Sequence, residues 1–349
     1  MNLEKLDGIL KECDGVLITS PHNLRYFTNF KGGEGVALIT HKERYLFVDP
    51  RYTMAATEEA VEFNVIEYTA GKRLAEIKDK LKEISRLGFE DFYMSFAEYK
   101  TFSSNFGDID FVPVSDKVEV TRIIKNGEEI HFLRQAEKIA VNALSNTIVH
   151  IKEGVTETEI AAELEYQMRK IGAEGPSFET VVVSGYKSGM PHGKPGQKKL
   201  EYGDFVTMDF GCVYNGYCSD MTRTVVIGKA NEEQKKIYEI VKKAQLAGLD
   251  AIKAGVTCSF ADNIARKIID DAGYGEYFGH SLGHGVGMLI HELPNVSSRC
   301  NTVLKENMIV TCEPGIYLQN GGVRIEDMVR VTKDGCENLT DFTKELLEL

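Results

Sequence analysis

The pattern of apolar and polar positions divides the chain into two parts. In the first part, short apolar runs typical of strands alternate with helical spacing, which predicts strands at residues 15–19, 35–40 and 44–48 and a helix at 74–84. The pattern breaks near Val120, and the segment NGEE at 126–129 then begins a long amphipathic stretch. We therefore expect two domains, a small α/β domain over residues 1–123 and a second domain over residues 124–349.

An internal repeat organises the second part of the chain. The segment IKEGVT at 151–156 recurs 101 positions later as IKAGVT at 252–257, and each copy leads into a helix-like stretch that ends at a glycine. The strands that follow also correspond, and their alignment pairs four acids, Asp209 with Glu313 and Asp220 with Glu326. We predict an α+β fold in which two hairpins, related by approximate two-fold symmetry, bring the four carboxylates together.

The four repeated acids are candidate metal ligands. Asp209 ends an otherwise apolar strand at 205–208, where an unpaired carboxylate is costly to bury. A single acid in this setting is more often a helix cap or the partner of an ion pair. Four converging carboxylates, however, repel each other strongly unless divalent cations lie between them. The symmetric set therefore favours metal binding over a structural role.

A glycine-rich segment, GHSLGHGVG at 279–287, offers a nitrogen ligand in His284. Glycines on both sides of this histidine allow backbone and metal to approach closely. A phosphate-binding loop is the alternative, but the segment has neither a Gly-Lys-Ser/Thr ending nor a Gly-x-Gly-x-x-Gly pattern. Oxygen ligands with one imidazole suit Mn, Co, Fe or Zn without choosing among them. Two such ions about 3.5–4 Å apart can share a hydroxide, lower the pKa of its parent water and stabilise an oxyanion.

Two further histidines are candidate donors to a tetrahedral intermediate. His192 lies in MPHG at 190–193, and His291 lies in IHELP at 290–294. Alone, each is more often a structural histidine than a catalytic one. Their places in loops beside the proposed metal site favour a catalytic role.

Composition narrows the choice of partners. The 41 basic and 53 acidic side chains give a net charge of -12, which repels nucleic acid and anionic membranes and leaves small peptides or metabolites as better partners. The first residues lack the apolar core of a signal peptide, and no apolar run approaches the roughly 20 residues that span a bilayer, so we expect a cytoplasmic protein. Seven scattered cysteines without a Cys-x-x-Cys pair predict buried, reduced thiols.

Five segments resemble those of the creatinase and methionine aminopeptidase superfamily of pita-bread metallopeptidases, and within it the Xaa-Pro peptidases. They are MDFG (208–211), SDMTRT (219–224), GHGVG (283–287), EPGIY (313–317) and VRIED (323–327). In the first part, SPHNLRY (20–26) and DPRY (49–52) resemble the small amino-terminal domain of Xaa-Pro peptidases and creatinases. The resemblance covers essentially the whole chain. It implies a pita-bread catalytic domain, a homodimer and hydrolysis of peptides with proline in second position.

The resemblance also implies two divalent metal ions and assigns their ligands. One ion would be bound by Asp209 and Asp220 and the other by His284 and Glu313, while Asp220 and Glu326 would bridge both. Attack on the peptide would come from a hydroxide shared by the two ions.

Roles for the remaining candidates follow from the same resemblance. Glu313 would help to activate the bridging water, His291 would stabilise the intermediate, and His192 would contact substrate or leaving group. His280 and Arg324 would support the ligands, as partners of metal ligands generally do.

One position departs from the pattern of similar dipeptidases, which place a basic residue soon after the His-Glu-x-Pro segment to pair with the carboxylate of the dipeptide. Here Asn295 follows Pro294, and Arg299 is the replacement candidate. A dipeptidase and an aminopeptidase P that acts on longer peptides therefore both stay open. A methionine aminopeptidase is disfavoured because that group generally lacks the amino-terminal domain, and a non-catalytic pita-bread binding protein is disfavoured because all five ligands are present.

Overall fold

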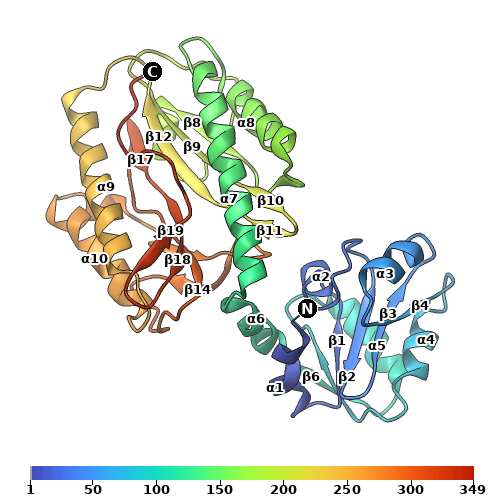
Figure 1. Ribbon diagram of the computed structural model, residues 1–349. Helices are drawn as coiled ribbons and strands as arrows, with labels where there is room; N and C mark the ends of the chain where they lie inside the picture. The colour runs from blue at the N-terminus through green and yellow to red at the C-terminus, as the bar shows by residue number, and fades with distance from the viewer. Residues whose placement is uncertain (1) are drawn as a thin grey trace. The chain divides into compact units, whose positions relative to one another are not determined.

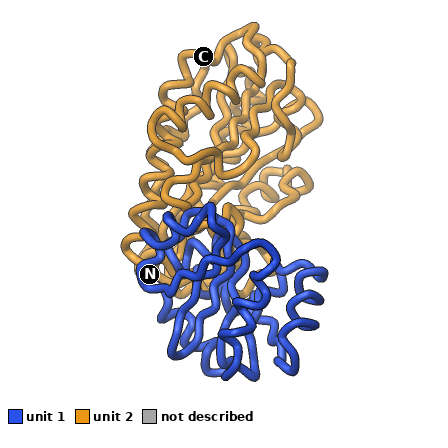
Figure 2. Tube along the Cα trace, turned by 90° about the vertical axis from the view of Figure 1, so that its right-hand side faces the viewer, with its two compact units in different colours: residues 1–122 blue, residues 123–349 orange. Residues whose placement is uncertain are grey.

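The computed structural model describes residues 2–349 and divides the chain into two compact units, residues 1–122 and 123–349 (Figure 2). Each unit has its own buried apolar cluster. Among the described residues, no helix is long and apolar enough to cross a membrane. All seven cysteines are free, and five of them are buried, as predicted.

The first unit is built on one mixed six-stranded sheet, in the order β4-β3-β2-β1-β5-β6. Antiparallel pairing joins β1 to β2 and β2 to β3, while the other neighbours are parallel. Its strands are β1 (Gly15–Ile18), β2 (Val36–Thr40), β3 (Arg44–Val48), β4 (Asn64–Glu67), β5 (Arg86–Phe89) and β6 (Asp110–Pro113). Its helices are α1 (Asp7–Leu10), α2 (Pro21–Thr28), α3 (Thr53–Glu59), α4 (Arg73–Asp79), α5 (Phe96–Phe106) and α6 (Ser115–Ile123), the last of which ends just past the unit boundary.

The three strands predicted in this unit are confirmed, but the predicted helix at 74–84 is too long. Helix α4 ends at Asp79, and the chain continues in turns whose amides bond to carbonyls three residues earlier, from Leu81 to Lys78 and from Ile84 to Leu81. Leu81 is buried even so. The apolar spacing therefore reflected burial of these side chains in consecutive turns rather than one continuous helix.

The second unit carries two helix pairs and several short sheets (Figure 1). Helix α7 packs on α8 and α8 on β8, whereas α9 packs on α10 and contacts β15 and β17. Its helices are α7 (Gly127–Thr147), α8 (Glu157–Ile171), α9 (Glu232–Ala251) and α10 (Cys258–Asp271). Its strands are β7 (Gly175–Pro176), β8 (Val181–Ser184), β9 (Phe205–Phe210), β10 (Cys212–Tyr214), β11 (Tyr217–Cys218), β12 (Met221–Val226), β13 (Gly283–Gly285), β14 (Glu292–Val296), β15 (Ile309–Cys312), β16 (Gly315–Leu318), β17 (Gly321–Arg324), β18 (Asp327–Val331) and β19 (Cys336–Asn338).

The sequence repeat is a structural repeat, so the α+β fold with pseudo-two-fold halves is confirmed. Both helices that follow the repeated segment begin at a threonine whose side chain caps the first turn, Thr156 for α8 and Thr257 for α10. The same pair of backbone hydrogen bonds then recurs in both halves: Gly154 N to Leu200 O and Leu200 N to Val155 O in the first, Gly255 N to Leu304 O and Leu304 N to Val256 O in the second. We call residues 127–226 the first half and residues 232–331 the second half.

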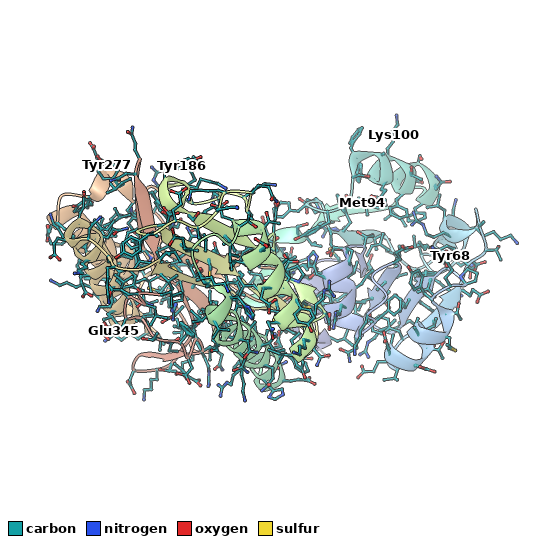
Figure 3. All side chains as sticks on the ribbon, turned by 90° about the horizontal axis from the view of Figure 1, so that it is seen from above. Tyr68, Met94, Lys100, Tyr186, Tyr277 and Glu345 are labelled. Carbon is teal, nitrogen blue, oxygen red and sulfur yellow. The ribbon has the colours of Figure 1, made fainter. Side chains whose placement is uncertain are left out.

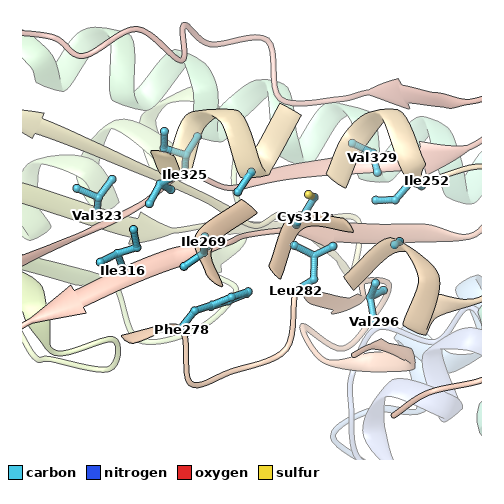
Figure 4. Packing of buried hydrophobic residues seen from close by; sticks show 14 of the residues in the cluster. Ile252, Ile269, Phe278, Leu282, Val296, Cys312, Ile316, Val323, Ile325 and Val329 are labelled. Carbon is cyan, nitrogen blue, oxygen red and sulfur yellow. The ribbon is translucent and has the colours of Figure 1, made fainter. Parts of the chain in front are cut away.

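Each half encloses its own apolar cluster, and these clusters fix the strands that carry the repeated acids. In the first half, α7 and α8 pack against β8, β9 and β12. In the second half, side chains of α9 and α10 meet those of β15, β16, β17 and β18, with Cys312, Ile316, Val323 and Val329 among them (Figure 4). Burial of this kind contributes roughly 25 cal/mol per Å² of apolar surface. The strands that end at the polar residues are therefore anchored by buried side chains in both halves.

Candidate metal centre

The four repeated acids lie at ends of strands in the middle of the second unit. Asp209 is the last but one residue of β9, Asp220 immediately precedes β12, Glu313 immediately follows β15, and Glu326 lies between β17 and β18. The two halves meet at this point, because Glu326 N donates a hydrogen bond of 3.1 Å to the carbonyl oxygen of Thr222 on β12. The hairpins of both halves therefore bring their acids to one seam.

Atoms suited to bind a metal converge at this seam. One ligand atom each from Asp220, His284 and Glu326 lie within 4.8 Å of one another. His284 Nε2 is 3.4 Å from Asp220 Oδ2 and 3.5 Å from Glu313 Oε1. Asp209 adds its negative charge to the same cluster.

The orientation of His284 leaves Nε2 free to act as a ligand. Its Nδ1 is 3.1 Å from the carbonyl oxygen of Gly285, which can only accept, so Nδ1 carries the proton. Burial lowers the pKa of His284 to about 4, so the ring is neutral near pH 7. The unprotonated Nε2 therefore faces the carboxylates. This tautomer, with the proton on Nδ1 and a carbonyl group as its acceptor, leaves Nε2 able to bind a metal.

Crowding of the carboxylates disfavours their charged forms. Burial and the charges of Glu326 and Asp209 raise the pKa of Asp220 well above its usual range. Burial and the charges of Glu313 and Asp209 do the same to the pKa of Glu326. The pKa of Glu313 is raised to about 8, chiefly by burial. Divalent cations would remove this repulsion.

The donor set fits such cations. Asp209 Oδ1 is buried and has no hydrogen-bond partner among the described residues. A buried carboxylate oxygen without a partner is costly, and a cation would satisfy it. Four carboxylates and one neutral imidazole are ligands that suit Mn, Fe, Co or Zn.

A chain of buried polar side chains orients the carboxylates. Arg324 Nη2 donates to Asp209 Oδ2 at 2.5 Å, its Nη1 to Tyr317 Oη at 2.9 Å and its Nε to Thr222 Oγ1 at 3.0 Å. Thr222 Oγ1 donates in turn to Glu326 Oε2 at 2.6 Å. One guanidinium thus supports acids of both halves, the kind of support that fixes ligand geometry.

His280 extends this chain as its last acceptor. Its Nδ1 lies 2.8 Å from the carbonyl oxygen of Ser281 and must donate to it, so Nε2 accepts the hydrogen bond of 2.7 Å from Tyr317 Oη. Burial and the charge of Arg324 lower the pKa of His280 to about 4, which keeps the ring neutral. His280 therefore holds Tyr317, and Tyr317 holds Arg324.

The other predicted residues, His291, His192 and Arg299, lie in loops and turns outside the carboxylate cluster. The ring of His291 packs edge-on against that of His284, with centroids 4.4 Å apart. His192 is exposed, and the carbonyl oxygen of the preceding Pro191 accepts a hydrogen bond of 3.4 Å from Arg324 Nη1. Arg299 is exposed in the turn after β14, and Asn295 pairs with His284 across β13 and β14.

Sequence reasoning missed Glu137, a buried acid on α7 behind the ligands. It accepts hydrogen bonds from Asp220 N at 3.2 Å and from Thr340 Oγ1 at 2.6 Å, and burial raises its pKa to about 8. A signal was available, because Glu137 lies four residues after Leu133 and three before Ala140, on the apolar face of the helix. Thr311, which donates to Glu313 Oε1 at 3.2 Å, carried no such signal.

This fold and donor set define a metal-dependent enzyme of the pita-bread class. The family model described as "Metallopeptidase family M24" matches residues 131–333, and the model described as "Creatinase/Prolidase N-terminal domain" matches residues 3–124. The chain belongs to metallopeptidase family M24, which confirms the family predicted from the five segments.

Similar proteins include enzymes described as dipeptidases and as an aminopeptidase. An Xaa-Pro dipeptidase of Pyrococcus furiosus is 42% identical, over 99% of both chains. The solved structure of an Xaa-Pro dipeptidase from Bacillus anthracis is 44% identical, with a TM-score of 0.96 over 100% of this chain and 99% of the other. An X-Pro aminopeptidase from Thermotoga maritima is 40% identical, with a TM-score of 0.93 over 97% of this chain and 98% of the other.

Proposed function

We propose that this metallopeptidase hydrolyses the bond before proline in Xaa-Pro dipeptides or short peptides, with two divalent metal ions bound by Asp209, Asp220, His284, Glu313 and Glu326. The observation that carries the metal proposal is the meeting of acids from both halves around one neutral imidazole. The names of its relatives support the substrate, since proteins 42–44% identical over nearly their whole length are described as Xaa-Pro dipeptidases.

When bound, the ions would lower the pKa of water and polarise the scissile carbonyl group. The residues around them supply the proton transfers and the orientation. We assign Glu313 to accept the proton of the attacking water, since its carboxylate faces the centre and is oriented by Thr311 Oγ1, which donates to Glu313 Oε1 at 3.2 Å. Arg324 holds Asp209 in place through its Nη2, while its own position depends on Tyr317.

We assign His291 to the tetrahedral intermediate and His192 to the substrate or its leaving group. Edge-on packing against His284 orients the His291 ring next to the ligands. The backbone beside His192 is attached to Arg324, so this loop reaches the same centre. Both rings would donate hydrogen bonds to developing charge on the substrate.

The length of the preferred peptide is the finer question. Asn295, opposite His284, is neutral and offers no cation for the carboxylate of a dipeptide. Arg299 follows four positions later and is exposed, so we propose it as the residue that would pair with that carboxylate. The similarity to an X-Pro aminopeptidase gives the alternative, cleavage of longer chains by the same centre.

A set of matched peptides tests this proposal. Protein loaded separately with Mn, Co, Zn or Fe is incubated with Xaa-Pro dipeptides, with longer peptides that begin Xaa-Pro, and with Met-Ala peptides. Cleavage of Xaa-Pro dipeptides alone identifies a dipeptidase, and cleavage of the longer chains identifies an aminopeptidase. Preferential cleavage of Met-Ala, or no metal-dependent cleavage of any peptide, contradicts the proposal.

Arg299 has its own test within that set. Arg299→Met should raise the KM for dipeptides, whose carboxylate lies near the cleaved bond, and leave the KM for longer peptides unchanged. An equal rise in the KM for dipeptides and for longer peptides would show that Arg299 does not bind the dipeptide carboxylate. The expected homodimer stays a prediction, which light scattering of the purified protein would check.

A further inference from the structure

The loop between β8 and β9 carries His192 and has the composition of a flexible segment. Residues 185–199 include four glycines, two prolines and four lysines. Exposed loops of such composition are usually mobile. A mobile loop would place His192 poorly, because productive contacts require positions held to within about 0.5 Å.

One buried carboxylate holds this loop from the helix side. Glu157, the first residue of α8, is fully buried and accepts hydrogen bonds from Ser184 N at 2.8 Å, Ser184 Oγ at 2.9 Å and Gly196 N at 3.0 Å. Its Oε2 also forms an ion pair with Lys187 Nζ. Lys187 Nζ donates to the carbonyl oxygen of Lys194 at 2.9 Å. The attached residues lie on both sides of His192 along the chain.

The opposite side of the loop is fixed by the β16–β17 hairpin. Ser188 Oγ accepts a hydrogen bond of 2.9 Å from Gly322 N and donates one of 2.6 Å to Gly185 O. Gly189 approaches so closely that an added Cβ would lie 2.0 Å from the carbonyl oxygen of Leu318. The loop is thus attached to α8 on one side and on the other to the hairpin that carries Arg324.

The side chain of Lys187 points into the protein, whereas that of the preceding Tyr186 lies at the surface. Tyr186, labelled in Figure 3, lies at the surface with 57% of its area exposed, while the side chain of Lys187 is only 17% exposed and turns inward to Glu157. A buried lysine–glutamate pair contributes little net stability compared with apolar residues of similar volume, because both charges lose their hydration. Its effect is instead to fix one arrangement of the chain.

The second half shows that the helix itself does not require this carboxylate. The counterpart of Glu157, 101 positions later after the equivalent capping threonine, is Cys258. Helix α10 forms there with the same backbone hydrogen bonds at its start, including Cys258 N to Thr302 O in place of Glu157 N to Lys198 O. Glu157 therefore serves the loop it binds rather than the helix on which it lies.

We propose that the largely buried Glu157–Lys187 pair is a positioning pair for His192, holding both flanks of its loop so that the imidazole can be presented to substrate at the proposed metal centre. Neither residue touches the ligands by the contacts described above. The part of this inference that concerns catalysis rests on the proposed function, whereas the part that concerns the loop does not.

The test compares buried and exposed ion pairs attached to the same loop. Glu157→Gln and Lys187→Met remove the buried pair, and Lys187→Arg restores a cation. Lys194→Met is the matched control, because it breaks the pair with Glu179 at 2.7 Å, whose side chains are 73% and 68% exposed. Amide hydrogen exchange of residues 185–199, the metal content, and kcat and KM for an Xaa-Pro peptide are measured for each variant.

We expect faster exchange in this loop for Glu157→Gln and Lys187→Met, and a loss of kcat/KM of about ten- to hundredfold with unchanged metal content. Lys187→Arg should recover most of that activity, and Lys194→Met should match the parent protein. In a His192→Ala background, Glu157→Gln should cause little further loss, because the interaction it supports has already been removed.

Two results would overturn the proposal: unchanged exchange in the loop of both buried-pair variants, or full additivity with His192→Ala. If Glu157→Gln does not fold, Lys187→Met carries the comparison alone. If no Xaa-Pro peptide is cleaved even by the parent protein, the proposed function fails, and hydrogen exchange still decides whether the pair holds the loop.

Discussion

The two halves of the second unit share a backbone but differ in chemistry. Both begin with a threonine-capped helix and repeat the same hydrogen bonds, and each ends in a hairpin with two acids. Pairing places Gly285 opposite Val310 in the second half and Ser184 opposite Val206 in the first, so the counterpart of His284 is the buried Val183. The carboxylates are thus duplicated, while the imidazole that we propose as a ligand occurs in one half only.

A second difference concerns the loops that carry the non-ligand histidines. In the first half the His192 loop is attached by Lys187 and Glu157. In the second half, Glu292 directly follows His291 and pairs with Lys125 at 3.1 Å, both side chains being buried. A largely or fully buried lysine–glutamate pair thus lies beside each of the two histidines, but Lys125 comes from the segment that precedes the first half, so the two pairs are not related by the repeat. The symmetry of the backbone thus determines where the four acids lie, whereas the imidazole and the buried ion pairs depend on individual side chains that the repeat does not share.

The largest expected effect is loss of the centre after removal of either central acid. Asp220→Asn and Glu326→Gln change acids of different halves, yet each should reduce the metal content. Each should also lower kcat/KM by more than about a hundredfold, which is the upper effect expected for a residue that only supports a ligand. The reason is that each carboxylate borders the other and His284. Elemental analysis and peptide cleavage check this. Full activity with unchanged metal content in either variant would show that one half can form the centre without the acid of the other, and would contradict the account.

Next in size is the ion pair that joins the halves. Arg223 on β12 and Asp327 on β18 are 2.7 Å apart, and their side chains are 2% and 0% exposed. Asp327→Asn leaves the buried guanidinium with backbone carbonyl partners but without its counter-charge, so we expect the free energy of unfolding to fall by about 3–5 kcal/mol. The exposed pair of Lys235 and Glu232 is the control, where Lys235→Gln should cost about 0–1 kcal/mol. Similar small costs in urea denaturation for both variants would show that the seam is not held by this pair.

A smaller effect is expected from Arg324, which supports acids of both halves. Arg324→Met should lower kcat/KM by about ten- to hundredfold, since Asp209 and Thr222 lose a hydrogen-bond donor. The position that corresponds in the first half is Cys218, two residues before Asp220 as Arg324 is two before Glu326, and Cys218→Ser should have little effect. If the two variants lose activity equally, support of the ligands is shared between the halves rather than supplied by the second.

The smallest effect is the dependence of stability on pH in the metal-free protein. Between about pH 6.5 and 8, unfolded carboxyl groups are ionised. Folded Glu313 and Glu137, with pKa values raised to about 8, still largely hold protons there. The folded state binds more protons, so stability falls as the pH rises through this window.

Histidines act in the opposite direction, but below this window. His280 and His284 have pKa values lowered to about 4, so they stabilise the folded state increasingly as the pH rises from about 4 to 6.5. We therefore expect the Tm of the metal-free protein to fall from pH 6.5 to 8 and added Mn to raise it more at pH 8. A Tm that rises over that interval without metal, measured by calorimetry, would contradict the crowding of the carboxylates.

Much of the architecture could be predicted because it repeats in the sequence. The recurrence of IKEGVT, together with two acids after each copy, predicted both the pseudo-two-fold fold and the meeting of acids at the seam. Support of these acids by His280 and Arg324 was predicted from the resemblance, whereas Thr222 and Tyr317 could not be predicted, because they join this chain of hydrogen bonds from separate elements through tertiary packing. Glycine and lysine content likewise gave no indication that residues 185–199 are fixed, since their partner Glu157 lies in the preceding helix.

The most direct test of the central claim is a crystal structure of the Mn-loaded protein with anomalous diffraction data. The account predicts two anomalous peaks about 3.5–4 Å apart at the seam. Asp209 and Asp220 should bind one ion, His284 and Glu313 the other, and Asp220 and Glu326 both. A single peak, or ions bound by carboxylates of one half alone, would contradict the claim that the duplicated acids and His284 form one dinuclear centre.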